Sequence, residues 1–285
     1  MDDSSHGRHD MRLIVGFGLI AFATAIFPAY AFDVTGCGQL IPPHTTGRVR
    51  ADIDCHNGSA LGALVDLGDG ATLALNGHTV SGGVNLGATV LSAKVSGPGT
   101  LNGTITAGRT VLKIDVRHLV IHAVGSGLFV DSGNTTRVRL KDVSIDGASA
   151  VAVTADQVDL TDVDVNDNPA SRGFAVLAYS TLRGTRVTAN HNGTASPGCT
   201  GCSALLSFGT AKLTGVQATG NAGYGVLAIS ALRLAKSTVT GNDGSGAGID
   251  IAASGRLRIS RTTCGLSGFA DPPFTAGYWH VCTND

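Results

Sequence analysis

Six aspartates in two neighbouring segments are the residues best placed by type and spacing to do chemistry. They are Asp142, Asp146, Asp159, Asp162, Asp164 and Asp167. Asp142 and Asp162 hold the same position in two similar segments, so stacking the segments would bring their carboxylates together. Such a pair can bind Ca²⁺ or share a proton for acid catalysis. The candidate catalytic residues are therefore Asp142 and Asp162, and the candidate metal ligands are Asp142, Asp146, Asp162 and Asp164.

The same aspartates also fit a solvated face held by ion pairs between neighbouring segments. Alignment of the segments places Arg139 over Asp159 and Arg186 over Asp164. Exposed pairs of this kind are common and contribute little stability. We therefore expect no catalytic residue and no resident cofactor, and Ca²⁺ enters only if the protein is an enzyme.

Two further patterns are similar to metal or redox motifs. His118 and His122 can face outward together, but the sequence places no third ligand beside them. Cys199 and Cys202 form a Cys-x-x-Cys motif without the βαβ context of a redox site and without a second ligand pair. The sequence therefore predicts neither a metal centre nor a redox centre.

A second set of outward positions is mostly apolar. In the short strand that opens each repeat, the predicted outward residues are Asn85, Thr106, Phe129, Ala152, Ala175, Leu205, Leu227 and Asp250. Such a stripe is either covered by the chain itself, with residues 191–203 as one source, or serves as a partner surface or a platform for sugar rings. The candidate binding residues are Phe129, Leu205 and Leu227.

The elements that position these residues repeat about every 20 residues. One inward position holds Leu140, Leu160, Leu182, Leu213 and Leu234. A second holds Val80, Leu101, Ile121, Ile145, Val165, Val187, Ala218 and Val239. Each repeat consists of short alternating strands that cannot bury their apolar side alone, so successive repeats must stack.

Stacking predicts an all-β fold, a right-handed parallel β-helix. It is a single-stranded solenoid of about nine turns over residues 62–267, with disulfide-tied N- and C-terminal caps. A content of 40 Gly and only 14% charged residues suits many short strands joined by tight turns. The asparagines at one strand-end position are predicted to form an internal hydrogen-bonded ladder, with an outward row for sugar hydroxyls as the alternative. They are Asn168, Asn190, Asn221 and Asn242.

Several segments resemble the right-handed parallel β-helix proteins of the pectin-lyase-like group. They are residues 51–55, residues 73–82, the repeated Thr-Gly-Asn and residues 279–285. The resemblance covers nearly all of residues 35–285 and implies the fold. It implies no single activity, because the group includes lyases, hydrolases, epimerases, tail spikes and proteins without a known reaction.

The termini indicate an exported protein. Residues 1–31 are predicted to be a signal peptide, with Arg8 and Arg12 near an apolar run and Ala29-Tyr30-Ala31 as the cleavage site. An uncleaved anchor is the alternative, although the run is shorter than the ~20 residues that a span needs. We expect a secreted or periplasmic protein without a membrane span after cleavage, with an N-terminal cap at residues 32–61 and a C-terminal cap at residues 268–285.

Six cysteines follow the predicted signal peptide, and an even number in an exported chain indicates disulfides. They are Cys37, Cys55, Cys199, Cys202, Cys264 and Cys282. Fifteen pairings are possible. We favour near neighbours, which pairs Cys37 with Cys55, Cys199 with Cys202 and Cys264 with Cys282.

The overall charge suggests no partner, since 20 Lys+Arg against 21 Asp+Glu give a net charge of −1. Such a chain has no net field to attract nucleic acid or an anionic membrane. The sequence favours a non-catalytic exported scaffold whose lateral face contacts a polysaccharide or another exported protein. The alternative is a polysaccharide lyase or glycoside hydrolase acting on an extracellular acidic polysaccharide, and a trimeric tail-spike-like or adhesin module is a third possibility.

Overall fold

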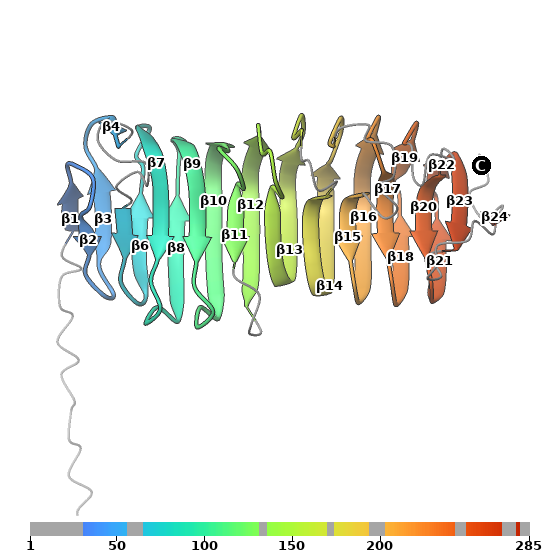
Figure 1. Ribbon diagram of the computed structural model, residues 1–285, viewed down its shortest axis with the longest axis horizontal. Coiled ribbons are helices and arrows are strands. Elements are labelled where there is room, and N and C mark those ends of the chain that lie inside the picture. Colours follow the sequence, from blue (N-terminus) through green and yellow to red (C-terminus); the bar gives the residue numbers. More distant parts are fainter. Residues whose placement is uncertain are drawn as a thin grey trace, which may run out of the picture.

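The structure is a computed structural model and describes residues 31–55, 65–130, 136–169, 174–193, 203–242, 249–269 and 278–279. The described residues form strands, turns and irregular segments, with no helix among them. The strands stack side by side into one long rod, with the N-terminal strands at one end and the C-terminal strands at the other (Figure 1). The rod is a parallel β-solenoid of about eight turns, close to the nine predicted.

The strands are β1 (Ala31–Val34), β2 (Leu40–Ile41), β3 (Thr46–Val49), β4 (Ile53–Asp54), β5 (Val65–Leu67), β6 (Ala71–Ala74), β7 (Thr79–Leu86), β8 (Ser92–Ser96), β9 (Thr100–Ala107), β10 (Lys113–His122), β11 (Leu128–Val130), β12 (Arg137–Asp146), β13 (Val153–Val165), β14 (Phe174–Thr188), β15 (Ser203–Ser207), β16 (Thr210–Thr219), β17 (Tyr224–Ala228), β18 (Ala231–Ala235), β19 (Thr238–Thr240), β20 (Ile249–Ala253), β21 (Arg256–Ser260), β22 (Thr263–Cys264), β23 (Leu266–Phe269) and β24 (Tyr278–Trp279).

Parallel pairing divides the strands into three lateral faces, and several long strands bend at a corner from one face to the next. The first face includes β11, β15, β17 and β20. The second includes β6, β8, β18 and β21, together with the first halves of β10, β12 and β16. The third includes β19 and β22 and the second halves of β10, β12 and β16.

Aliphatic columns fill the interior between the three faces, as the repeat predicts. The second predicted column is paired from Val80 through Leu101, Ile121 and Ile145 to Val165, and Ala218 pairs with Val239. These side chains belong to one continuous buried core. Because equivalent residues of parallel strands lie about 4.8 Å apart, each aliphatic side chain packs on those of the coils before and after it.

The predicted alignment is wrong by two residues in one coil. Leu182 pairs with Val158, and Gly184 takes the place opposite Leu160 and Leu213. Val187 likewise pairs with Val163 instead of Val165. A shift of two residues keeps every side chain on the same side of a strand, so the inward pattern alone does not reveal it. A Cβ at position 184 would lie 2.7 Å from Leu213 Cδ2, so the glycine makes room for that leucine.

An internal asparagine ladder is present, with Asn192 in the place predicted for Asn190. The Nδ2 atoms of Asn168, Asn192 and Asn221 donate to the Oδ1 of the next asparagine at 2.9, 3.0 and 2.7 Å. Asn190 lies two residues earlier and accepts hydrogen bonds from Thr219. The cause is the same two-residue shift. The left-handed residue before each ladder asparagine marks the correct position, for instance His191 (φ 52) and Gly220 (φ 63).

The ladder ends on a buried aspartate. Asn242 donates to Asp250 Oδ1 through its backbone N and through Nδ2, both at 2.8 Å, and Gly265 N donates to Oδ2 at 2.9 Å. Asp250 is therefore inside, not on the outward stripe where the sequence placed it. Burial raises the pKa of this carboxyl, while the hydrogen bonds from Asn242 and Gly265 oppose the rise.

The N-terminal disulfide is confirmed, since Cys37 and Cys55 are bonded with their Cα atoms 5.6 Å apart. Cys264 is also disulfide-bonded. Its predicted partner Cys282, the predicted pair Cys199–Cys202 and residues 1–30 of the predicted signal peptide lie outside the described residues. In the segment predicted as the N-terminal cap, β3 and β4 pair in parallel with β6 and β7, and at the other end β24 pairs antiparallel with β23.

Candidate functional site

The two candidate catalytic aspartates lie in one column at the corner between the second and third faces. His118, Asp142, Asp162 and Arg186 succeed one another there on four coils, each with φ between 52 and 54°. Aspartate and histidine tolerate this left-handed conformation better than bulky or branched residues do. Asp142, Asp162 and Asp164 line a common surface pocket of about 460 Å³. The pairing of coils therefore brings these predicted residues together.

One corner carboxylate faces an imidazole and the other faces a guanidinium. His118 Nδ1 lies 3.2 Å from Asp142 Oδ2, and Arg186 Nη2 donates to Asp162 Oδ2 at 2.6 Å. The predicted pairing of Arg186 with Asp164 is wrong, because Asp164 lies opposite Thr188. The hydrogen bond from Arg186 lowers the pKa of Asp162, and the same bond raises the pKa of Arg186.

These shifts oppose proton transfer at neutral pH. A lyase base needs an arginine that gives up its proton, and a hydrolase acid needs a carboxyl that keeps one. Arg186 and Asp162 are shifted the other way. Asp146 pairs with His122 at 2.7 Å, and no group of three or more His, Cys, Asp or Glu side chains that could hold a metal ion occurs within the described ranges.

The predicted apolar stripe is displaced in register and covered. Thr154, Leu177 and Leu206 take the outward positions that the sequence assigned to Ala152, Ala175 and Leu205. Leu205 pairs with Val226 in the interior, and the outward Leu227 is only 1% exposed. A second buried cluster around Leu177, Leu206 and Leu227 lines this side.

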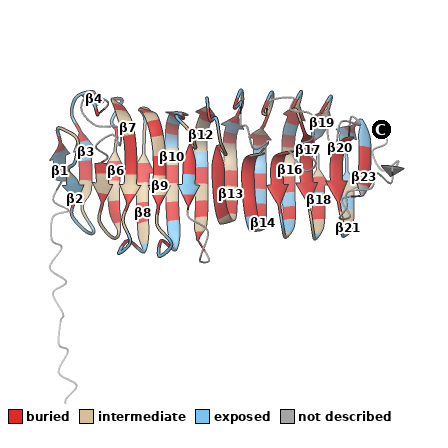
Figure 2. Cartoon of the chain, in the orientation of Figure 1, coloured by how far each residue is buried: buried red, intermediate tan, exposed pale blue. Residues whose placement is uncertain are grey.

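Figure 2 agrees, since β17 and β20 are buried along almost their whole length. Because burial is that of the single chain, the chain itself covers the stripe. Leu205 and Leu227 therefore offer no free binding surface. Phe129 does, since it is 43% exposed and lies at the uncovered end of the stripe beside Thr106 and Thr154.

The second face is basic, although the net charge of the whole chain is close to zero. Fifteen of the chain's 20 Lys and Arg lie on its outward positions or on the corner column beside it. They are Arg48, Lys94, Lys113, Arg117, Arg137, Arg139, Lys141, Arg183, Arg186, Lys212, Arg233, Lys236, Arg256, Arg258 and Arg261. The aspartates at such positions are Asp33, Asp115, Asp142, Asp159 and Asp162.

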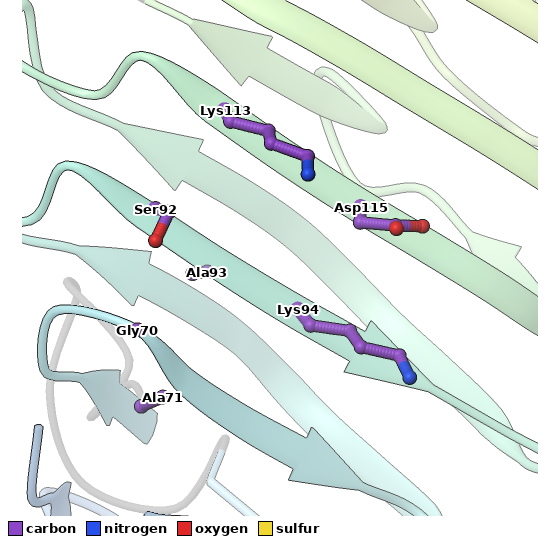
Figure 3. Close-up of a pocket in the computed structure, with 7 residues that line it drawn as sticks. All are labelled: Gly70, Ala71, Ser92, Ala93, Lys94, Lys113 and Asp115. Carbon is purple, nitrogen blue, oxygen red and sulfur yellow. The ribbon is translucent and has the colours of Figure 1, made fainter. Parts of the chain in front are cut away.

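In the N-terminal half of this face, opposite charges alternate. Along its middle row, Lys94, Asp115, Arg139, Asp159 and Arg183 lie opposite one another on successive coils. Arg137 donates to Asp159 at 2.5 Å, and Arg117 donates to Asp115 at 2.6 Å. Figure 3 shows part of this region, where Lys94, Lys113 and Asp115 line a small pocket of about 170 Å³. The charges here largely satisfy one another.

In the C-terminal half the alternation stops. Arg183, Lys212, Arg233 and Arg258 lie opposite one another on four consecutive coils, without an aspartate between them. We call the six cations of the last three coils the cationic patch: Lys212, Arg233, Lys236, Arg256, Arg258 and Arg261. All six are exposed, and none has an ion-pair partner among the described residues. Like charges placed directly opposite one another destabilise a sheet, so the patch has a cost that folding alone does not explain.

Comparisons with known proteins give no match: no protein-family model, no curated protein and no solved structure corresponds to this chain. The fold thus stands on its own geometry, without a family assignment. A search of the described residues also finds no helix that is long and apolar enough to cross a membrane.

Sequence reasoning missed the cationic patch although a signal for it was present. The residues before the inward Leu140, Leu160, Leu213 and Leu234 are Arg139, Asp159, Lys212 and Arg233, and together with Arg183 they form one outward row. The two-residue slip removed Arg183 from that row and placed Thr181 there instead. The net charge of the whole chain also gives no sign that the positive charges gather on one face.

Proposed function

We propose that this protein is an exported, non-catalytic β-helix scaffold that binds a polyanionic partner on its second face. The observation that carries the proposal is the cationic patch: six exposed cations on three adjacent coils, without an acidic partner in the part of the chain that the structure describes. Clustered positive charge on a rigid surface attracts polyanions and speeds their association. The partners that we expect are an acidic polysaccharide or an acidic surface of another exported protein.

Export and the pectin-lyase-like affiliation belong to this proposal. The disulfide between Cys37 and Cys55 is consistent with an oxidising compartment outside the cytosol. The predicted signal peptide at residues 1–31 supports the same location. The parallel coils agree with the architecture of the pectin-lyase-like group, whose members differ widely in activity.

The enzymatic alternative is less favoured because of the ion pairs at the corner. Asp142 faces His118 and Asp162 faces Arg186, and the resulting pKa shifts keep Arg186 protonated and Asp162 ionised. Asp162 therefore already has the charge-neutralising partner that an acid catalyst or a Ca²⁺ site would have to displace.

A binding and activity measurement tests both ideas. The mature protein should bind an acidic polysaccharide such as alginate, should not bind a neutral glucan, and should lose affinity as salt is raised. Arg233→Gln and Arg258→Gln should weaken binding, whereas Lys113→Gln, on the alternating half of the same face, should not. Failure to bind any soluble or surface-bound polyanion contradicts the proposal. Ca²⁺-dependent cleavage that is lost in both Asp142→Ala and Asp162→Ala would instead establish the enzyme.

A further inference from the structure

We infer that the partner of the cationic patch is a planar anionic lipid surface, which the last three coils contact with their part of the second face. This inference rests on the proposed function, because it takes the patch as the binding face. It goes further by assigning to this face an anionic lipid surface in place of the polysaccharide or protein considered above. Two independent features of the face support it: the distribution of the cations in two dimensions and an exposed apolar ridge along one edge.

The cations cover the width of the face as well as its length. Arg256 begins β21, Arg258 lies in the middle row, and Arg261 lies on the corner column beyond the strand. With about 3.3 Å per residue along a strand and 4.8 Å between strands, the array measures roughly 16 Å across the face and 10 Å along the rod. A single polymer chain running along the middle row would contact Lys212, Arg233 and Arg258 and leave the outer cations unused. A surface of lipid headgroups meets all of them at once.

The apolar ridge follows the edge between the first and second faces. Tyr179, Phe208 and Ile229 come directly after the paired positions Ala178, Ser207 and Ala228, so they succeed one another on three coils. Tyr179 is 40% and Phe208 is 47% exposed, whereas Ile229 is half-buried against the cluster around Leu177. The ridge begins on the coil of Arg183 and continues on those of Lys212 and Arg233. The same coils therefore present apolar side chains at one edge and cations on the adjoining face.

The two rings form one continuous apolar edge. Tyr179 and Phe208 are stacked with an offset, their centroids 5.9 Å apart and their planes at 14°. Ile229 follows on the next coil. Aromatic side chains at a bilayer interface require contact with the headgroup and acyl boundary, which an edge of this kind can make beside the cations.

Vesicle co-sedimentation of the mature, disulfide-bonded protein tests the inference. Vesicles of phosphatidylcholine alone should leave the protein in solution, and an equimolar mixture with phosphatidylglycerol should sediment it. Each of Arg233→Gln and Arg258→Gln should lower partitioning about fivefold, since one cation near an anionic surface contributes about that factor. Phe208→Ser should also lower partitioning and should do so even at salt concentrations that screen the charges. Lys113→Gln is the matched control and should leave partitioning unchanged.

The outcomes separate the inference from the proposed function. Binding of alginate without binding of anionic vesicles, with both Arg233→Gln and Arg258→Gln impaired, overturns the lipid surface and retains the polyanion-binding face. Sedimentation that none of the patch or ridge substitutions changes also overturns the inference, because docking then uses another surface. Binding of neither probe overturns both. Circular dichroism of every variant, matched to the unaltered protein, ensures that a loss of binding reflects the face and not the fold.

Discussion

Arg233 lies between two cations, so a substitution at this position can measure how much stability the patch costs the protein. Its neighbours in register are Lys212 and Arg258. Arg233→Glu would restore the alternation of charge seen in the other half of the face. We expect the unfolding free energy to rise by about 0.5–1 kcal/mol at low salt, and the gain to vanish at high salt. Urea denaturation at two salt concentrations measures it.

The matched control for this substitution is Arg139, which lies between Asp115 and Asp159 in the same row. Arg139→Glu places three acids in succession, so it should destabilise the protein by a similar amount. A loss of stability in both variants would mean that removal of the arginine side chain, and not the charge pattern, determines the result. Opposite signs would show that the patch is maintained against its own repulsion.

Asp250 predicts a pH dependence. Burial raises its pKa above the ordinary 3.8, so the folded protein binds this proton more tightly than the unfolded chain does. Its contribution to the unfolding free energy therefore falls as the pH rises from 3.8 through the raised pKa and is constant above it. Asp162 has the opposite effect, since its pKa is lowered. The difference in stability between the unaltered protein and Asp250→Asn, measured from pH 3 to 8, isolates Asp250 and should follow the first trend. A flat difference contradicts it.

The limit of sequence analysis at this scale is visible in Leu205 and Asp250. Leu205 was placed outside because its strand was assigned one residue out of register, and Leu206 takes the outward position. Asp250 was placed outside because the pairing of β20 is irregular between Ile249 and Ile251, where simple alternation of sides fails. Alternation tells which residues of a strand share a side, but short runs such as Ser203–Ser207 are apolar on both sides. Because the outer side of these strands is also buried, its residues are apolar too, and the difference in polarity that normally distinguishes the inner side from the outer side is missing.

At the scale of elements, the asparagine ladder is the feature that the sequence predicted in kind and misplaced in one member. Asn192 accepts from Asn168 and donates to Asn221 and to the Val165 carbonyl, and it is 3% exposed. Asn190 is more exposed and bonds only to its neighbours on adjacent coils. In the structure, each ladder asparagine follows a residue in the left-handed conformation, and this rule selects Asn192. The sequence does not reveal the rule, because glycine at position 220 suggests a left-handed conformation whereas Asp167 and His191 do not.

The two asparagines therefore give a direct test of the ladder. Asn192→Ala removes the acceptor of the buried Asn168 backbone N–H and the donor to the Val165 carbonyl, and the amides of Asn168 and Asn221 each lose one hydrogen bond. We expect it to cost about 2–3 kcal/mol of unfolding free energy. Asn190→Ala should cost about 1 kcal/mol or less because water can reach the groups it leaves. Denaturant unfolding of the two variants under one condition makes the comparison. Equal costs would contradict the assignment of the ladder to Asn192.

At the scale of the whole molecule, stacking and charge separation have different origins in the sequence. The solenoid follows from inward aliphatic columns that recur in every coil, so a single sequence suffices to predict it. The basic face can be predicted only when the register of every coil is known. A residue belongs to a row because of the residues that lie opposite it on the coils before and after. One slip at Gly184 was enough to break the row in the predicted alignment.

The full chain has a net charge of −1 and a pI of about 6.7, and loss of residues 1–31 would remove three aspartates and two arginines. A protein with charges balanced in this way would ordinarily pass through a cation exchanger at pH 8. We expect the mature protein to be retained, because a sulfonate matrix meets the cationic patch locally and not the average over the surface. Lys212→Gln, Arg233→Gln and Arg258→Gln together should abolish retention. Lys94→Gln, Lys113→Gln and Arg137→Gln together remove the same charge from the alternating half, where aspartates lie close by, and should shift elution much less. Equal shifts in elution for the two triple variants would mean that net charge alone governs retention. That result would contradict the cationic patch as a binding site.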